Sequence, residues 1–124
     1  MGPDFWWIAG GVALLGGAGS VLRFALSKWN NSLPWGILTA NTLASAVVGF
    51  CLDTGSGVLP IIVATVFATG FAGGLSTFST WAGQTAQFFL DKKFGKAALN
   101  VLLNMVLPFS GLMAGLILGH VLLK

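Results

Sequence analysis

The most constraining feature of this sequence is an uncharged run from about Val58 to Leu90 with two adjacent glycines, Gly73 and Gly74, near its middle. An α-helix rises about 1.5 Å per residue, so as one helix the run would measure roughly 50 Å, against a bilayer core of about 30 Å. Paired glycines weaken a helix interior, and we therefore predict that the helix breaks there. Lipid cannot satisfy the backbone groups exposed at such a break, so the break must face protein, water or an ion.

The rest of the chain has the composition of an integral membrane protein, with 56% hydrophobic and 7% charged residues and a mean hydropathy of +0.90. A water-soluble domain could not cover such a chain with polar surface. Four apolar stretches each reach the ~20 residues that span a bilayer. They predict an all-α membrane protein with a single transmembrane domain over residues 1–124 and spans at 5–26, 34–52, 58–90 and 96–123.

The first stretch is too long and too rich in glycine for a signal peptide, and it has no basic start, so we expect a retained helix. Four helices leave little room for an enclosed pathway within one subunit. Oligomerisation is therefore expected.

The sequence contains few residues of the kinds that support catalysis or metal binding. Cys51 is the only cysteine, which excludes an internal disulfide and a cysteine-rich metal site. His120 is the only histidine and lies near a predicted membrane edge, where a polar interfacial role is favoured over a ligand or a proton relay. The sequence shows no pairing of Ser, His and Asp and no cluster of metal ligands. We expect that the protein is not an enzyme.

Basic residues are distributed unequally between the two predicted membrane sides. The loops after the first and third spans, which lie on one side, carry five of them, whereas the opposite side carries only Lys124 and the N-terminal amine. The positive-inside rule then places those two loops in the cytoplasm and both termini outside. The five residues are Arg23, Lys28, Lys92, Lys93 and Lys96.

Hydroxyl side chains cluster directly after the glycine pair. Thr77 and Thr80 share one helix face, and Ser76 and Ser79 complete the cluster. If the second half of the helix begins near Leu75, its positive dipole end points at the bilayer centre, beside the free carbonyls of the first half. Such a break can hold an anion on its N–H groups or a cation on its carbonyls. The alternative is a packing kink whose hydroxyls bond the preceding turn.

Amide side chains lie inside two other spans. Asn41 is in the second, where it either joins helices or lines a wet cavity. Asn100 and Asn104 are one turn apart in the fourth, and Pro108 leaves the Asn104 carbonyl without its helical partner. Together they predict a neutral, hydrogen-bonding track. The fourth span also carries a stripe of small residues for close helix contact, formed by Gly111, Gly115 and Gly119.

Charges inside the predicted membrane are almost absent. Arg23 ends the first span and either extends to the interface or raises the positive potential of an anion vestibule. The acidic residues Asp4, Asp53 and Asp91 are terminal or in loops. Ion-coupled carriers normally need an intramembrane carboxylate, so the sequence favours passive conduction of a neutral or anionic solute.

Over almost its full length the chain resembles the small bacterial fluoride channels called Fluc or CrcB. The first span ends in Arg23-Phe24, as in that family, and the segment from Gly36 to Asn41 also matches. Residues 70–81 resemble the family signature Gly-x-x-Gly-Gly-x-Thr-Thr-Phe-Ser-Thr-Phe, which is specific to it.

This resemblance implies an antiparallel dimer with two narrow fluoride pathways, which passively exports cytoplasmic fluoride and confers fluoride resistance. It also implies a structural Na⁺ on the dimer axis, held by the backbone carbonyls of Gly73 and Ser76 from each subunit. Arg23 would stand at the anion vestibule. The implied fluoride pathway comprises Asn41, Thr77, Phe78, Thr80, Trp81, Asn100 and Asn104.

Three residues depart from the family pattern. Trp81 replaces the second phenylalanine of the signature, Ile37 stands where threonine is usual, and Gln84 stands where glutamate is common. With the strong charge bias, these departures suggest a subunit of fixed orientation that pairs with an oppositely oriented homologue. A homodimer remains open, because charge bias predicts only insertion.

Two other functions compete with the channel. A small multidrug transporter is also a four-helix dimer, but it needs a glutamate in its first span, where this chain has none. A non-conducting or partner-dependent structural subunit of a heterodimeric channel is the second alternative, and a flux assay with the partner present separates it from a channel.

Overall fold

The computed structural model describes residues 2–52 and 60–123, and within them the chain is helical apart from short connections. The helical segments are α1 (Asp4–Ser27), α2 (Trp35–Leu52), α3 (Ile61–Thr65), η2 (Val66–Ala72), α4 (Gly73–Leu75), α5 (Ser79–Leu90) and α6 (Phe94–Leu122). If α3 to α5 are taken as one broken helix, four helices are long and apolar enough to cross a membrane. The predicted all-α, four-span architecture is therefore confirmed. The expected third-span start at Val58, together with Asp53 and Lys124, lies outside the described residues.

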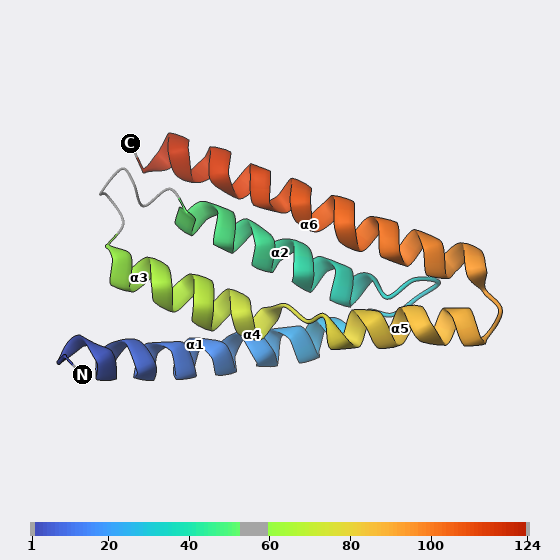
Figure 1. The fold of residues 1–124 in the computed structure, drawn as a ribbon, viewed down its shortest axis with the longest axis horizontal. Helices are drawn as coiled ribbons and strands as arrows, with labels where there is room; N and C mark the ends of the chain where they lie inside the picture. The colour runs from blue at the N-terminus through green and yellow to red at the C-terminus, as the bar shows by residue number, and fades with distance from the viewer. Residues whose placement is uncertain (1, 53–59, 124) are drawn as a thin grey trace.

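The helices form two pairs that run alongside each other (Figure 1). In one pair α1 packs against η2 and α4, and in the other α2 packs against α6 over most of its length. After the break the third helix changes partners, because α5 packs against the first half of α6 rather than against α1. Both chain ends lie at one end of the bundle, opposite the connections at 28–34 and 91–93. Which end faces the cytoplasm stays a prediction.

Glycines on α6 allow the close contact with α2. A Cβ on Gly111 would lie 2.6 Å from the carbonyl oxygen of Thr42, and a Cβ on Gly115 would meet the carbonyl oxygen of Ala46. A Cβ on Gly119 would lie 2.8 Å from the carbonyl oxygen of Phe50 in α2. The stripe of small residues predicted for the fourth span is therefore confirmed as a helix-packing surface.

The third helix is broken as predicted, but the break does not lie at the glycine pair. Gly73 and Gly74 are helical, whereas Ser76 is extended, with φ −78° and ψ 153°. The following half-helix begins at Ser79 rather than near Leu75. Gly74 serves close packing instead: a Cβ there would collide with the backbone of Gly16 in α1. Gly74 thus brings two helices together, whereas a Cβ on Gly73 would meet nothing within 4 Å, and the chain leaves the helix only after the Gly74 contact ends.

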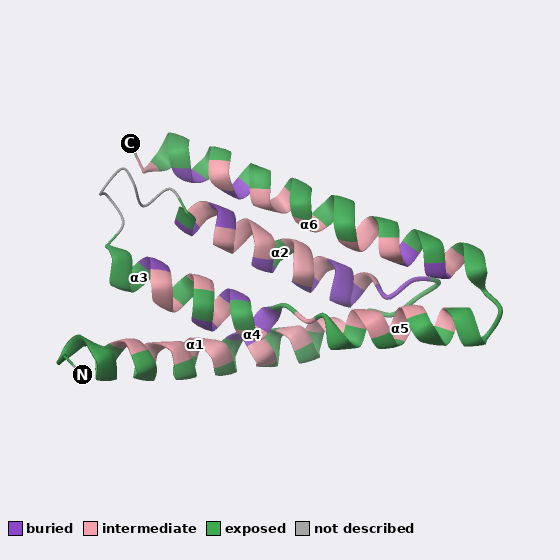
Figure 2. Ribbon diagram, in the orientation of Figure 1, coloured by how far each residue is buried: buried purple, intermediate pink, exposed green. Residues whose placement is uncertain are grey.

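The described chain leaves much of its apolar surface uncovered. Figure 2 shows burial concentrated on α2 and on the faces turned toward it, with exposed residues along the outer faces of α1, α5 and α6. Exposed large side chains include Leu14, Val21 and Phe24, at 77%, 69% and 66%. Such faces need lipid or a second subunit to cover them.

Candidate functional site

The break between α4 and α5 is bridged by the amide of Asn41 from α2. Its Oδ1 accepts a hydrogen bond from the backbone N–H of Thr77 at 2.8 Å, and its Nδ2 donates to the Thr77 carbonyl oxygen at 3.2 Å. The side chain thus pairs with both backbone groups of one residue, as a neighbouring peptide would. This pairing satisfies at the break the polar groups that lipid cannot satisfy.

Thr77 also caps the second half-helix. Thr77 directly precedes the N-cap residue Phe78, and its Oγ1 accepts a hydrogen bond from the Thr80 N–H at 3.2 Å, as an N-capping hydroxyl does, and donates to Thr80 Oγ1 at 3.1 Å. Ser79 Oγ lies 3.5 Å from the same hydroxyl. The predicted hydroxyl cluster therefore organises the start of α5, with Thr77 at its centre.

These bonds leave carbonyls of the first half-helix without their helical donors. In a continuous helix the Thr77 N–H would bond the Gly73 carbonyl and the Thr80 N–H would bond that of Ser76. Here those donors go to Asn41 and to the Thr77 hydroxyl. The predicted sodium ligands are thus the two oxygens that these donors would otherwise occupy.

Arg23 reaches one of these two oxygens. Its Nη1 donates to the Ser76 carbonyl at 3.4 Å, and nearby Ser20 Oγ donates to the Gly74 carbonyl at 3.4 Å. Neutral carbonyl oxygens suit Na⁺. The Gly73 oxygen fits such an ion directly, whereas the Ser76 oxygen is shared with the Arg23 guanidinium. Arg23 therefore lies at the break itself.

The three predicted pathway asparagines lie in one hydrogen-bonded series. Asn41 Nδ2 donates to Asn104 Oδ1 at 3.1 Å, and Asn104 Nδ2 donates to Asn100 Oδ1 at 3.2 Å and to the Asn100 carbonyl at 3.0 Å. Asn100 Nδ2 donates to Thr85 Oγ1 at 2.9 Å. Asn100 is only 1% exposed, whereas Asn41 and Asn104 are half-buried.

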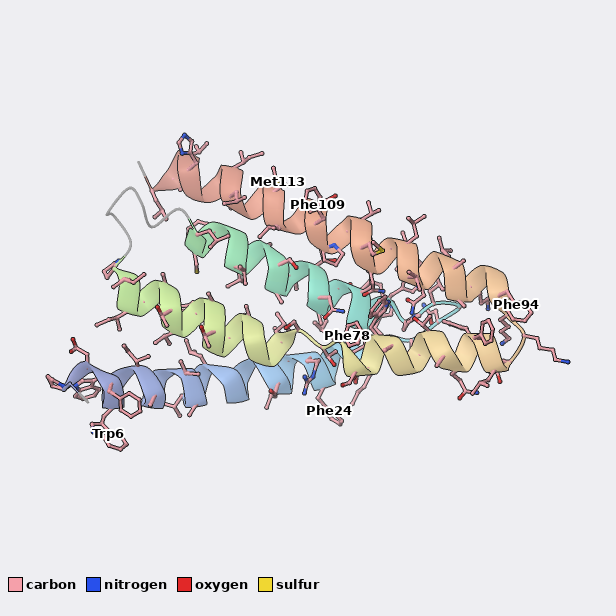
Figure 3. The ribbon with its side chains drawn as sticks, viewed as in Figure 1. Trp6, Phe24, Phe78, Phe94, Phe109 and Met113 are labelled. Atoms are coloured by element: carbon pink, nitrogen blue, oxygen red, sulfur yellow. The ribbon has the colours of Figure 1, made fainter. Side chains whose placement is uncertain are left out.

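The two predicted pathway aromatics are in contact, but they differ in how exposed they are and in whether they are hydrogen-bonded. Phe78 and Trp81 meet edge to face, with ring centroids 5.1 Å apart. Phe78 is 74% exposed and lies at the junction of α4 and α5, halfway along the molecule (Figure 3). Trp81 is half-buried, and its Nε1 donates to the Asn100 carbonyl at 3.2 Å. The indole N–H that distinguishes Trp81 from phenylalanine is thus used to hold α5 against α6.

A groove of about 290 Å³ opens over the break. Five of the seven residues predicted for the fluoride pathway line it: Asn41, Thr77, Phe78, Trp81 and Asn104. Thr80 joins through its bond to Thr77, and Asn100 lies behind the groove wall rather than on it. Ser45, Ser76 and Pro108 complete the lining.

Sequence reasoning missed two members of this region as site residues. Ser45 lines the groove, and its position one turn after Asn41 on the same helix face was the available signal. Thr85 accepts a hydrogen bond from Asn100 and was not among the predicted site residues. The i, i+4 spacing from Trp81 to Thr85 was the signal for that hydroxyl.

The other two departures from the family pattern, Ile37 and Gln84, do not line this groove. Ile37 in α2 is 2% exposed and belongs to the buried core of the protein. Gln84 lines a second, polar hollow of about 260 Å³ beside Asn30 and Asn31, at the end of the bundle that holds both short connections. Its Oε1 is buried without a hydrogen-bond partner among the described residues. A group that donates a hydrogen bond, such as water, would satisfy that oxygen.

The sequence of this chain is similar to those of known proteins. Residues 11–116 match the family model described as CrcB-like protein, Camphor Resistance (CrcB). A protein from Mycobacterium bovis named Fluoride-specific ion channel FluC 2 is 37% identical over 114 residues, which covers 88% of this chain and 86% of the relative. Proteins named Fluoride-specific ion channel FluC from Syntrophotalea carbinolica and Parabacteroides distasonis are 34% and 36% identical, over 82% and 86% of this chain and 89% and 88% of theirs.

Proposed function

Since this chain belongs to the CrcB family, we propose that it is a fluoride-selective channel, a multi-pass protein of the bacterial plasma membrane that lets cytoplasmic fluoride leave passively and so confers fluoride resistance. The observation that carries this proposal is the groove over the break. The amides of Asn41 and Asn104 line it together with the aromatic pair Phe78 and Trp81, and no carboxylate does. Family membership also sets aside the small multidrug transporter.

The groove has the chemistry that fluoride requires. A small, strongly hydrated anion must exchange its water for close donors, and the amides and the Thr77 hydroxyl supply such donors without a fixed positive charge. The positive edges of the Phe78 and Trp81 rings can face the anion as well. These contacts are individually weak, and conduction needs sites that release the ion as readily as they bind it.

A second subunit completes the pathway in this proposal. The groove is open on one side, and Phe78, Phe24 and Val21 near the break are all more than half exposed. An antiparallel partner would cover these faces, with a Na⁺ on the axis between the subunits. The Gly73 and Ser76 carbonyls of each copy would hold this ion. Its positive charge would offset the partial negative charges of the carbonyl oxygens that meet across the axis.

The function is tested by fluoride flux from liposomes that contain the purified chain. We expect a fluoride electrode to record rapid efflux while a chloride electrode under the same gradient records none. The proposed function is contradicted if fluoride remains trapped both with the chain alone and with an oppositely oriented homologue present. That result would favour the structural subunit.

The same assay separates the two kinds of dimer. A homodimer conducts when the chain is reconstituted alone. A heterodimer conducts only when the oppositely oriented homologue is added, which would agree with the charge bias and with the changes at Trp81 and Gln84.

The proposed Na⁺ is tested by replacing it with N-methyl-D-glucamine, which is too large for a cage of carbonyls. Removing a ligand that binds only the dimer should speed subunit exchange by about tenfold or more. Energy transfer between differently labelled subunits measures that exchange at constant ionic strength and constant chloride. Equal exchange rates in the two cations would contradict a sodium site.

A further inference from the structure

A series of hydrogen bonds joins the break of the third helix to the first turns of α5 through three helices. It starts at the Thr77 N–H, passes through the amides of Asn41, Asn104 and Asn100, and reaches Thr85. It ends where Thr85 Oγ1 donates to the Trp81 carbonyl at 2.9 Å. Every link donates in the same direction, from α4–α5 through α2 and α6 and back to α5.

The two ends of this series fix its direction. A backbone N–H can only donate and a backbone carbonyl can only accept, so neither the Thr77 end nor the Trp81 end can be reversed. A side-chain amide can otherwise turn over and exchange its oxygen and nitrogen. If Asn104 turned over, its NH₂ would face that of Asn41, and its oxygen would face Asn100 Oδ1 and the Asn100 carbonyl, which loses three hydrogen bonds at once.

The series has a part in the groove and a part behind it. Asn41 and Asn104 line the groove, whereas Asn100 is 1% exposed and neither it nor Thr85 lines it. We propose, on the basis of the fluoride-channel function above, that Asn100 and Thr85 are positioning residues that fix the orientation of the Asn104 amide. A single amide donor, Asn41 Nδ2, is then bonded to Asn104 Oδ1 in the groove lining, and fluoride binds Asn41 Nδ2 by displacing that oxygen.

Loss of the fixed direction would change how fluoride is held. Without an acceptor at Thr85, Asn100 Nδ2 loses its partner and the Asn100 amide can turn over, which leaves Asn104 held only by Asn41 Nδ2 and the Asn100 carbonyl. The Asn104 amide then turns over more readily. Two NH₂ groups, from Asn41 and Asn104, would then converge on one anion. A tighter site slows release, so maximal efflux falls while the fluoride concentration for half-maximal efflux also falls.

Thr85→Val tests this proposal, because valine keeps the shape of threonine and removes only the hydroxyl. We expect a maximal efflux about tenfold lower, with a half-saturating fluoride concentration lowered by a similar factor. Thr85→Ser restores the hydroxyl and should restore both values. Thr42→Val is the matched control, because Thr42 Oγ1 also bonds its own preceding turn, at the Leu38 carbonyl, but lies outside the series.

Two flux results would overturn the proposal: Thr85→Val behaving like Thr42→Val, or a slower rate at an unchanged half-saturating concentration, which marks a general packing defect. If Thr85→Val does not fold, Thr85→Ala is measured in its place.

A second measurement does not depend on conduction and separates this proposal from the function it rests on. Hydrogen exchange at the Thr77 N–H, followed by NMR, should be about fivefold faster in Thr85→Val than in Thr42→Val, since the series that holds Asn41 is weakened. Equal exchange rates at the Thr77 N–H in Thr85→Val and Thr42→Val overturn the positioning role, even if the chain does not conduct fluoride. Absence of flux in the unmodified chain, both alone and with an oppositely oriented homologue present, would instead overturn the channel function alone.

Discussion

Phe78→Ile is expected to lower fluoride efflux by roughly a hundredfold while the protein remains folded and dimeric. Phe78 and Trp81 are the two aromatic residues that line the groove, and Phe78 is the more exposed of them. Its ring meets Trp81 edge to face. Isoleucine preserves most of the apolar volume but has no ring edge to present to an anion. The fluoride-electrode assay in liposomes measures the change, and size-exclusion chromatography checks assembly.

Phe89→Ile is the matched control for this substitution. Phe89 lies near the end of α5, whereas Phe78 directly precedes the start of that helix. Phe89 is 62% exposed and meets Phe94 edge to face at 5.1 Å, the same separation as in the Phe78 pair. It lies away from the groove. Efflux in this control should stay within about twofold of the unmodified chain. If both variants lost efflux alike, the aromatic edge at Phe78 would have no special role.

The broken third helix shows what the sequence could predict and where it failed. The length of the apolar run and its polar centre required an interruption, and the structure contains one. Its position could not be predicted from the glycine pair, because glycine permits either a break or a close contact. Gly74 lies against the backbone of Gly16, a residue far away in sequence, and that contact decides which of the two roles it takes.

The amide of Asn41 shows a similar limit. Its presence in mid-membrane predicted either a joint between helices or a pathway residue, and these alternatives stayed open. In the structure it bonds Thr77 and Asn104 and also lines the groove, so it joins helices at the site itself. A sequence pattern assigns residue faces within one helix, but the meeting of α2, α5 and α6 at one point depends on tertiary packing. The pathway role of Asn41 stays a prediction.

Trp81 was predicted as a pathway residue because it stands where the resembled family has the second phenylalanine of its signature. Its indole N–H is bound to the Asn100 carbonyl, so the ring edge facing Phe78 is what this residue can offer an anion. No spacing rule predicts this bond, since Trp81 and Asn100 lie on different helices. The substitution of phenylalanine by tryptophan therefore adds a helix contact, and the aromatic pair is retained.

Gly19→Ala is expected to destabilise the folded chain by about 3 kcal/mol, at the upper end of the cost of overpacking. A Cβ on Gly19 would meet the Phe71 carbonyl oxygen and lie 2.9 Å from the Leu75 nitrogen, so it presses on the backbone of the third helix just before the break. Backbone cannot move aside as a flexible side chain can. Unfolding by SDS titration in detergent micelles measures the loss.

Gly10→Ala on the same helix separates this collision from the ordinary effect of replacing glycine in a helix, because a Cβ on Gly10 meets nothing within 4 Å. Alanine favours helix formation, so Gly10→Ala should leave stability unchanged or slightly higher. The contacts of Ser20 and Arg23 with the Gly74 and Ser76 carbonyls lie on the same side of α1 as Gly19. Separation of α1 from α4 would break them together, so Gly19→Ala should lose efflux as well as stability. Equal stability of the two alanine variants would show that α1 does not hold the break in place.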